Sequence, residues 1–196
     1  MDRSDLIYYL DADRIALGLV RIKPRTFGDD IWKYQRALRH YEYWLSRPKS
    51  ILSLLPRVWW HYRYHKLSIR LGFEIPPFVA GPGLSLAHRG PVIVNSHARI
   101  GRNCRIHSGV NIGSAAGDHN HAPIIGDNCY LGPGAKLFGR IEILDGTAVG
   151  ANAVVNKSFG AKNITLGGIP ARVISNKSAL PYVIDGAGLA DRKSVV

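Results

Sequence analysis

The stretch from Val94 to Val155 repeats with a period of six residues. Aliphatic side chains occupy every sixth position, with one longer gap in the middle. They are Val94, Ile100, Ile106, Ile112, Ile125, Leu131, Leu137, Ile143, Val149 and Val155. Neither an α-helix nor a simply alternating strand has this period. It is typical of a hexapeptide-repeat parallel β-helix, in which three hexads form one triangular coil and each coil packs on its neighbours. The sequence therefore predicts a mainly β solenoid.

A second row of small or aliphatic residues lies four positions after the first, and it contains both cysteines, Cys104 and Cys129. This position predicts that they fill the inside of the coils rather than form a disulfide. Two unlinked cysteines fit a reducing compartment, and residues 1–5 lack the apolar core of a signal peptide. We therefore expect a cytoplasmic protein. The sequence contains no run of eighteen apolar residues, so it predicts no membrane span.

The repeat is interrupted between Ile112 and Ile125, where the step is thirteen residues instead of six. The surplus lies in the segment 114–123, which is rich in Gly, Asp, Asn and His. A rigid scaffold holds such a loop in place while its side chains stay free to act. The loop is therefore a candidate functional site.

The residues before the repeat predict helices. Apolar positions spaced by three or four indicate helices over 2–20, over 29–45 and over 50–71, the last broken or kinked near Pro56. The third segment mixes Trp and Tyr with Lys and Arg. It fits a helix that packs on a partner or on the base of the solenoid, and it also fits an interfacial membrane helix. Its apolar stripe favours packing, with a peripheral membrane contact through 50–71 as the alternative.

These patterns predict three parts: a helical N-terminal domain over 1–71, a β-helix domain over 72–175, and a C-terminal extension over 176–196. The formal net charge is +12. Such a surface suits nucleic acid, anionic lipid or a small polyanionic ligand. Because no DNA- or RNA-binding motif accompanies the charge, we do not expect nucleic acid as a partner.

Five segments carry a resemblance to a known family. They are Gly72-Phe73-Glu74-Ile75-Pro76-Pro77, Leu86-Ala87-His88, Ile106-His107-Ser108-Gly109-Val110-Asn111-Ile112-Gly113, Gly117-Asp118 and Gly168-Ile169-Pro170-Ala171-Arg172. In order and spacing they resemble the catalytic domain of serine acetyltransferases and their hexapeptide-repeat O-acetyltransferase relatives. The short helical N-terminal part is more similar to variants encoded with surface-polysaccharide enzymes. The resemblance implies a left-handed β-helix that forms a homotrimer, or a dimer of trimers, with active sites between subunits.

The resemblance also implies a reaction, the transfer of an acetyl group from acetyl-CoA to a hydroxyl. A hydroxyl attacks a thioester slowly unless a base removes its proton, and histidine has a suitable pKa. The family's base aligns with His88, and the carboxylate that orients it aligns with Glu74. Two departures are present. Ala87 replaces the family's Asp, and the spacing from carboxylate to histidine is fourteen residues rather than fifteen, which the longer Glu side chain could offset.

In this family the acceptor is held by a loop. The candidate residues are Asp118, His119 and His121, which resemble a Gly-Asp-Arg-His-Pro segment. Because the loop is two residues longer here, either histidine can take the family's place, and we favour His121. The family's Arg, which contacts the serine carboxylate, has no counterpart here, and Arg89 or Arg102 are the candidate substitutes. L-Serine, the acceptor in the first step of cysteine synthesis, is the expected substrate. A sugar or surface-polysaccharide precursor is the alternative.

The expected co-substrate is acetyl-CoA, which the family binds in the groove between neighbouring β-helices. Small residues would admit the pantetheine arm, and cations would meet the phosphates. The implied residues are Gly113, Gly132, Ala135, Gly150, Ala151, Lys157, Gly168, Ile169, Pro170 and Arg172. Taken singly, each glycine is explained as well by the backbone conformation of a coil turn as by contact with the co-substrate.

Two other functions use the same scaffold. A metal enzyme like the γ-carbonic anhydrases needs three histidines, two of them spaced His-x4-His, and this spacing does not occur in the sequence. We therefore expect no metal. A non-catalytic trimeric scaffold is the remaining alternative.

Overall fold

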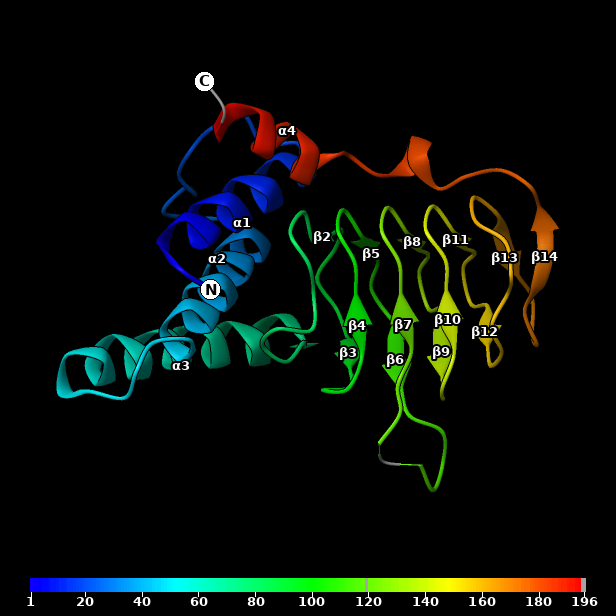
Figure 1. The fold of residues 1–196 in the computed structure, drawn as a ribbon, viewed down its shortest axis with the longest axis horizontal. Coiled ribbons are helices and arrows are strands. Elements are labelled where there is room, and N and C mark those ends of the chain that lie inside the picture. The colour runs from blue at the N-terminus through cyan, green and yellow to red at the C-terminus, as the bar shows by residue number, and fades with distance from the viewer. Residues whose placement is uncertain (119, 195–196) are drawn as a thin grey trace.

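The computed structural model describes residues 1–118 and 120–194, with side chains up to Asp191. The chain begins with α1 (Arg3–Ala16), α2 (Asp30–Leu45) and α3 (Ile51–Leu71) (Figure 1). Asp2 and Ser50 cap α1 and α3, each accepting a hydrogen bond from the N–H three residues on. None of the helices in this described part is long and apolar enough to cross a membrane.

The expected break near Pro56 is wrong, because α3 continues through it as one helix. Proline removes a single backbone N–H donor and crowds the preceding turn. Pro56 lies only five residues after the first residue of α3, so the cost falls near the helix end and the remaining ladder continues.

Beyond Gly72 the chain forms short strands. They are β1 (Phe73–Glu74), β2 (Ser85–Leu86), β3 (Val92–Val94), β4 (Arg99–Ile100), β5 (Arg105–Ile106), β6 (Asn111–Gly113), β7 (Ile124–Ile125), β8 (Tyr130–Leu131), β9 (Lys136–Phe138), β10 (Glu142–Ile143), β11 (Ala148–Val149), β12 (Val154–Val155), β13 (Thr165–Gly167) and β14 (Arg172–Ser175). The pairing of β13 with β14 is antiparallel, and the other strand pairs of the described chain are parallel.

The strands form three sheets that the chain visits in turn. The first sheet has the order β1-β3-β6-β9-β12, the second β10-β7-β4, and the third β14-β13-β11-β8-β5-β2. Val94 pairs with Ile112, and Leu131 pairs with Val149, so partners lie three hexads apart. The period of six thus correctly predicts parallel sheets, with one strand per hexad and one round of the three sheets per three hexads.

The aliphatic hexad residues form the core of this part. Ile100, at 4% exposure, is the most exposed of the ten. Cys104 and Cys129 are fully buried free thiols, as predicted. The small side chains of the second row allow the three sheets to approach one another around this apolar interior.

A buried arginine joins the helices to the beginning of the coils. The guanidinium of Arg39 donates to the carboxylates of Asp13 and Glu42, at 2.9 and 3.1 Å, and to the carbonyl oxygens of Ala80 and Gly81, at 2.8 and 2.7 Å. The N–H groups of Phe78 and Leu84 donate to the two carboxylates. This Arg39 cluster fixes the segment 78–84, which leads directly into β2.

The C-terminal residues 176–194 form what we call the closing strap, which runs back along the stacked coils to the helices (Figure 1). The N–H of Ala179 donates to the carbonyl oxygen of Gly146 at 2.7 Å, and the N–H of Ala187 donates to Oδ1 of Asn103 at 2.8 Å. The strap ends in α4 (Gly186–Ser194), which packs on α1.

Candidate active site

His88 lies two residues after β2, where the chain turns from the third sheet into the first. Its side chain is exposed, and its ring centroid lies 5.5 Å from that of His107, which directly follows β5. The row of rings continues through Tyr130, 5.0 Å from His107, and Tyr182 of the closing strap, 5.3 Å from Tyr130. An accessible imidazole therefore lies at this turn with a second imidazole beside it.

His107 is a residue that the sequence did not single out for the site. Its Nε2 atom is buried and has no hydrogen-bond partner among the described residues. Burial lowers the pKa of His107, and the positive charges of Arg105 and His88 lower it further. A neutral ring with an unpaired nitrogen next to the candidate base is a group that could meet a substrate. The pairing of Leu86 with Ile106 is the signal that could have located it, since both histidines follow this pair within two residues.

Glu74 lies in a different sheet from β2, the strand that precedes His88. It ends β1 of the first sheet, where it is exposed and pairs in register with Ile93. Within the described residues no hydrogen bond connects Glu74 with His88. The pairing of the carboxylate of Glu74 with His88 therefore stays a prediction.

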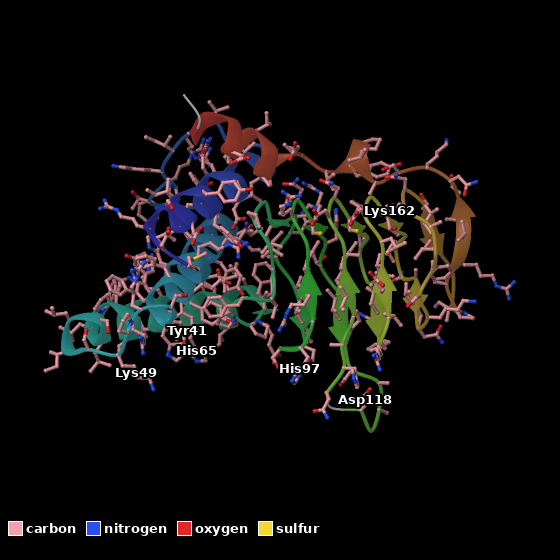
Figure 2. All side chains as sticks on the ribbon, in the orientation of Figure 1. Tyr41, Lys49, His65, His97, Asp118 and Lys162 are labelled. Carbon is pink, nitrogen blue, oxygen red and sulfur yellow. The ribbon has the colours of Figure 1, made fainter. Side chains whose placement is uncertain are left out.

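The loop 114–123 extends away from the sheets between β6 and β7, and Asp118 lies on it (Figure 2). His121 turns its Nδ1 atom toward the carboxylate of Asp118, at 2.9 and 3.0 Å from the two oxygens. The backbone N–H of Asn120, and then the His121 ring, hold the pKa of Asp118 below its usual range. The carboxylate thus orients the imidazole and leaves Nε2 on the opposite side of the ring. His119, the other predicted histidine, lies outside the described residues.

The residues predicted for acetyl-CoA lie along both edges of the first sheet. Four turns lead from the third sheet into the first, at 87–91, 107–110, 132–135 and 150–153, and the turn 168–171 joins β13 to β14 and bonds to Val154 of β12. We call these five turns together the histidine edge. We call the turns out of the first sheet, at 95–98, 114–123, 139–141 and 156–164, the loop edge. The histidine edge carries Gly132, Ala135, Gly150, Ala151, Gly168, Ile169 and Pro170. The loop edge carries Lys157, and Gly113 ends the strand that leads into it. Arg172 begins β14, next to the histidine edge.

Two of the predicted glycines, Gly132 and Gly113, differ in the space that surrounds them. A Cβ atom on Gly132 would lie 2.8 Å from the carbonyl oxygen of Val149 and 2.9 Å from the nitrogen of Ala151, so the contact between coils requires glycine there. A Cβ atom on Gly113 would meet nothing closer than 3.4 Å, which is ordinary van der Waals contact. Coil packing therefore explains Gly132 and leaves Gly113 unexplained.

The two arginines suggested for the acceptor are both paired with carboxylates. Arg89 lies 3.0 Å from Oδ2 of Asp30, and Arg102 lies 3.1 Å from Oδ2 of Asp127. Both side chains are largely exposed, so each keeps donors that face solvent. Across the described residues there is no group of three or more His, Cys, Asp or Glu side chains that could hold a metal ion.

Comparisons with curated proteins identify relatives of one kind, although no family model matches the chain. The chain is 28% identical over 156 residues to a serine acetyltransferase of Synechococcus elongatus, a match that covers 79% of this chain and 61% of that protein. It is 33% identical over 116 residues to a serine acetyltransferase of Mycobacterium tuberculosis, covering 58% of this chain and 50% of that protein. The chain spans about half the length of the curated relatives it matches.

Solved structures agree with these relatives. The soybean serine acetyltransferase complexed with serine aligns with a TM-score of 0.67 and 26% identity, over 88% of this chain and 69% of that one. The Brucella abortus serine acetyltransferase in complex with coenzyme A aligns with a TM-score of 0.63 over 89% of this chain and 68% of that one, and at 21% identity it supports the fold alone. In sequence and in fold the chain is therefore similar to serine acetyltransferases, which confirms the resemblance read from its motifs.

Proposed function

We propose that this protein is an acetyl-CoA-dependent O-acetyltransferase whose acceptor is L-serine. The observation that carries the proposal is the exposed His88, which the motif resemblance aligns with the family's base, in a chain that is 33% identical over 116 residues to a serine acetyltransferase. One structural relative, at 26% identity, supports the choice of acceptor, since it is complexed with serine. The curated relatives, which are serine acetyltransferases, support acetyl transfer as the reaction.

The same proposal includes a left-handed β-helix that assembles into a trimer, or a dimer of trimers. The separation of the site residues supports it. His88 and His107 lie at the histidine edge, whereas Asp118 and His121 lie at the loop edge on the other side of the first sheet. When the histidine edge of one copy faces the loop edge of the next, the two half-sites meet and enclose a groove. In this site Glu74 would orient His88, as the motif resemblance implies.

The chemistry follows from these positions. His88 takes the proton of the acceptor hydroxyl while its oxygen attacks the thioester carbonyl of acetyl-CoA. The tetrahedral oxyanion needs a donor, and backbone N–H groups near Gly113 are the proposed source. Collapse of this intermediate breaks the carbon–sulfur bond, and the thiolate of CoA takes the proton back from His88. Lys157 and Arg172, both exposed cations, would hold the phosphates of the co-substrate.

A saccharide hydroxyl is the second candidate acceptor, and one feature of the loop favours it. The described loop pairs His121 with Asp118, but the segment 114–123 contains no arginine that could bind the serine carboxylate. Arg89 and Arg102 would have to leave or share Asp30 and Asp127 in order to do so.

The test measures release of the CoA thiol from acetyl-CoA with L-serine, with hexoses and with nucleotide sugars. We expect turnover with L-serine to exceed the no-acceptor rate. His88→Asn should lower kcat by about 10²–10⁴-fold, whereas His65→Asn, on the surface of α3 away from the sheets (Figure 2), should not change it. Turnover with a sugar alone would move the proposal to the saccharide acceptor. No turnover with any hydroxyl, or full activity in His88→Asn, would overturn the proposal.

The proposal retains the three-part organisation: a helical domain over 1–71, a catalytic domain over 72–175 and an extension over 176–196. The ends of α3 at Leu71 and of β14 at Ser175 support these boundaries. Two buried free cysteines support the proposed location in a reducing cytoplasm.

A further inference from the structure

Helix α3 is apolar on two opposite sides. Its inner side packs on α2, where Trp60 stacks on His40 with ring centroids 4.0 Å apart, whereas the sequence predicted packing on a partner or on the base of the solenoid. The other side faces solvent. Its residues follow one another by three, four or seven positions and are 53–86% exposed: Ile51, Leu55, Val58, Tyr62 and Ile69. We call this row the outer stripe. A helix with a single packing partner needs only one apolar side. The outer stripe therefore indicates that a second apolar surface contacts α3.

Cations flank the outer stripe. Arg63 lies over the ring of the exposed Trp59 at 5.8 Å, and Lys66 lies over the ring of Tyr62 at 5.7 Å. Within the described residues neither cation forms an ion pair. Between Glu42 and Glu74 the sequence contains no acidic residue, although it contains six basic ones: Arg47, Lys49, Arg57, Arg63, Lys66 and Arg70. The positive charge on this side is therefore not neutralised locally.

A groove beside the stripe adds further cations. It has a volume of about 570 Å³ and lies between α3 and the segment 24–33. Five basic side chains and one carboxylate line it: Arg25, Lys33, Arg63, Lys66, Arg70 and Asp30. Asp30 is engaged by Arg70 at 3.2 Å and by Arg89 at 3.0 Å. The remaining cations leave the groove suited to a phosphate group.

We infer that the outer stripe and its cations bind the surface of an anionic phospholipid membrane, with α3 lying in the plane of the interface. Exposed aliphatic residues would enter the acyl boundary, Trp59 and Tyr62 would sit at the headgroup level, and lysine and arginine would meet the lipid phosphates. A second copy of the chain fits less well, because two outer stripes in contact would bring Arg63 and Lys66 of both copies together without a carboxylate. Figure 1 shows α3 extending away from the sheets, with α1 and α2 together on one side of it. This inference is independent of the proposed reaction.

The test is co-sedimentation of the full chain with vesicles of phosphatidylcholine, with and without about 30% phosphatidylglycerol. We expect binding only to the anionic vesicles, weakened by salt, with a blue shift of tryptophan fluorescence that Trp59→Phe removes. The double change Arg63→Gln and Lys66→Gln should lower the partition coefficient about 25-fold, since each surface cation contributes about fivefold. Leu55→Ser with Val58→Ser should also abolish sedimentation. Arg140→Gln and Val20→Ser remove an exposed cation and an exposed aliphatic residue elsewhere and should have no effect.

Three results would overturn the inference: no binding to anionic vesicles, equal binding to neutral vesicles, or unchanged binding of the stripe variants. A fall in solution mass in the stripe variants, together with no vesicle binding by the parent chain, would instead assign the surface to a second copy. Acetyl transfer measured on the same samples keeps the two proposals apart. Vesicle binding without transfer contradicts only the proposed reaction, and transfer without vesicle binding contradicts only this inference.

Discussion

Replacing Arg39 with methionine tests whether the Arg39 cluster joins the helices to the coils. Methionine keeps much of the length and volume of arginine but donates no hydrogen bond. The change leaves the carboxylates of Asp13 and Glu42, which are 2% and 1% exposed, without their cation. Removing one partner of a buried ion pair costs about 3–5 kcal/mol. The carbonyl oxygens of Ala80 and Gly81 also lose a donor, at about 1 kcal/mol each.

We therefore expect Arg39→Met to lower the free energy of unfolding by about 5–7 kcal/mol, measured by urea unfolding at pH 7.5. The pH dependence gives a second readout. Burial already raises the pKa of Asp13 and of Glu42 while Arg39 opposes it, and in the variant nothing opposes it. A carboxyl with a raised pKa binds more protons in the folded state, so its stability contribution is lost as the pH rises. The deficit of the variant should accordingly shrink by about 2 kcal/mol between pH 7.5 and pH 5.

Two companion variants make the result interpretable. Lys162→Met removes an exposed pair with Asp145, at 2.7 Å, and should cost less than about 1 kcal/mol. Adding Asp13→Asn and Glu42→Gln to Arg39→Met removes the unpaired charges and should restore part of the loss. A deficit below about 1.5 kcal/mol that does not change with pH would refute the reasoning, because it would mean that the carboxylates find other partners or water.

Three further predictions address the helices and the site. Burial, aided by a neighbouring arginine, lowers the pKa of His40 to about 4. Because the folded protein binds this proton less readily than the unfolded chain, whose histidine pKa is about 6.5, the folded state loses stability as the pH falls below that value. The free energy of unfolding should drop by about 1–2 kcal/mol between pH 7 and pH 4.5, and by less in His40→Phe. Thermal unfolding across that range checks it, and equal slopes would contradict it. Gly113→Ala should keep the parent Tm and raise the KM for acetyl-CoA about tenfold, whereas Gly132→Ala should lower Tm by about 2–8 °C; the reverse order would remove Gly113 from the groove. Asp118→Asn frees the His121 ring and should lower kcat/KM for the acceptor about 10–100-fold at unchanged KM for acetyl-CoA, and an unchanged acceptor kcat/KM would exclude the loop pair from acceptor binding.

The period of six predicted the part of the fold that depends on local repetition. Each hexad contributes one buried aliphatic residue, such as Ile106 or Leu131, so its position fixes the register between coils. The helices over 29–45 and 50–71 and the position of the loop followed equally from local spacing. The closing strap was expected only as an extension, because α4 gains its packing from α1, far away in the sequence.

The site was less accessible to sequence reasoning, because its residues interact across sheets. The motif resemblance proposed His88 and the Asp118–His121 segment as site residues, and the structure pairs Asp118 with His121. The spacing between Glu74 and His88 did not reveal that Glu74 and β2 lie in different sheets, since no hexad repeat precedes Val94. The sequence did not single out Arg39, because its partners other than Glu42 lie 26 to 42 residues away along the chain.

The closing strap changes how the stack of coils can come apart. A solenoid whose coils contact only their neighbours can lose them one at a time from a free end. Here the chain leaves β14, bonds to the coil turn at Gly146 and finally packs α4 on α1. The last coil cannot peel away without pulling on the first helix, and the first helix cannot detach without loosening the far end. Under heat or mechanical load the coils and helices should therefore unfold together in one cooperative step, rather than coil by coil from one end.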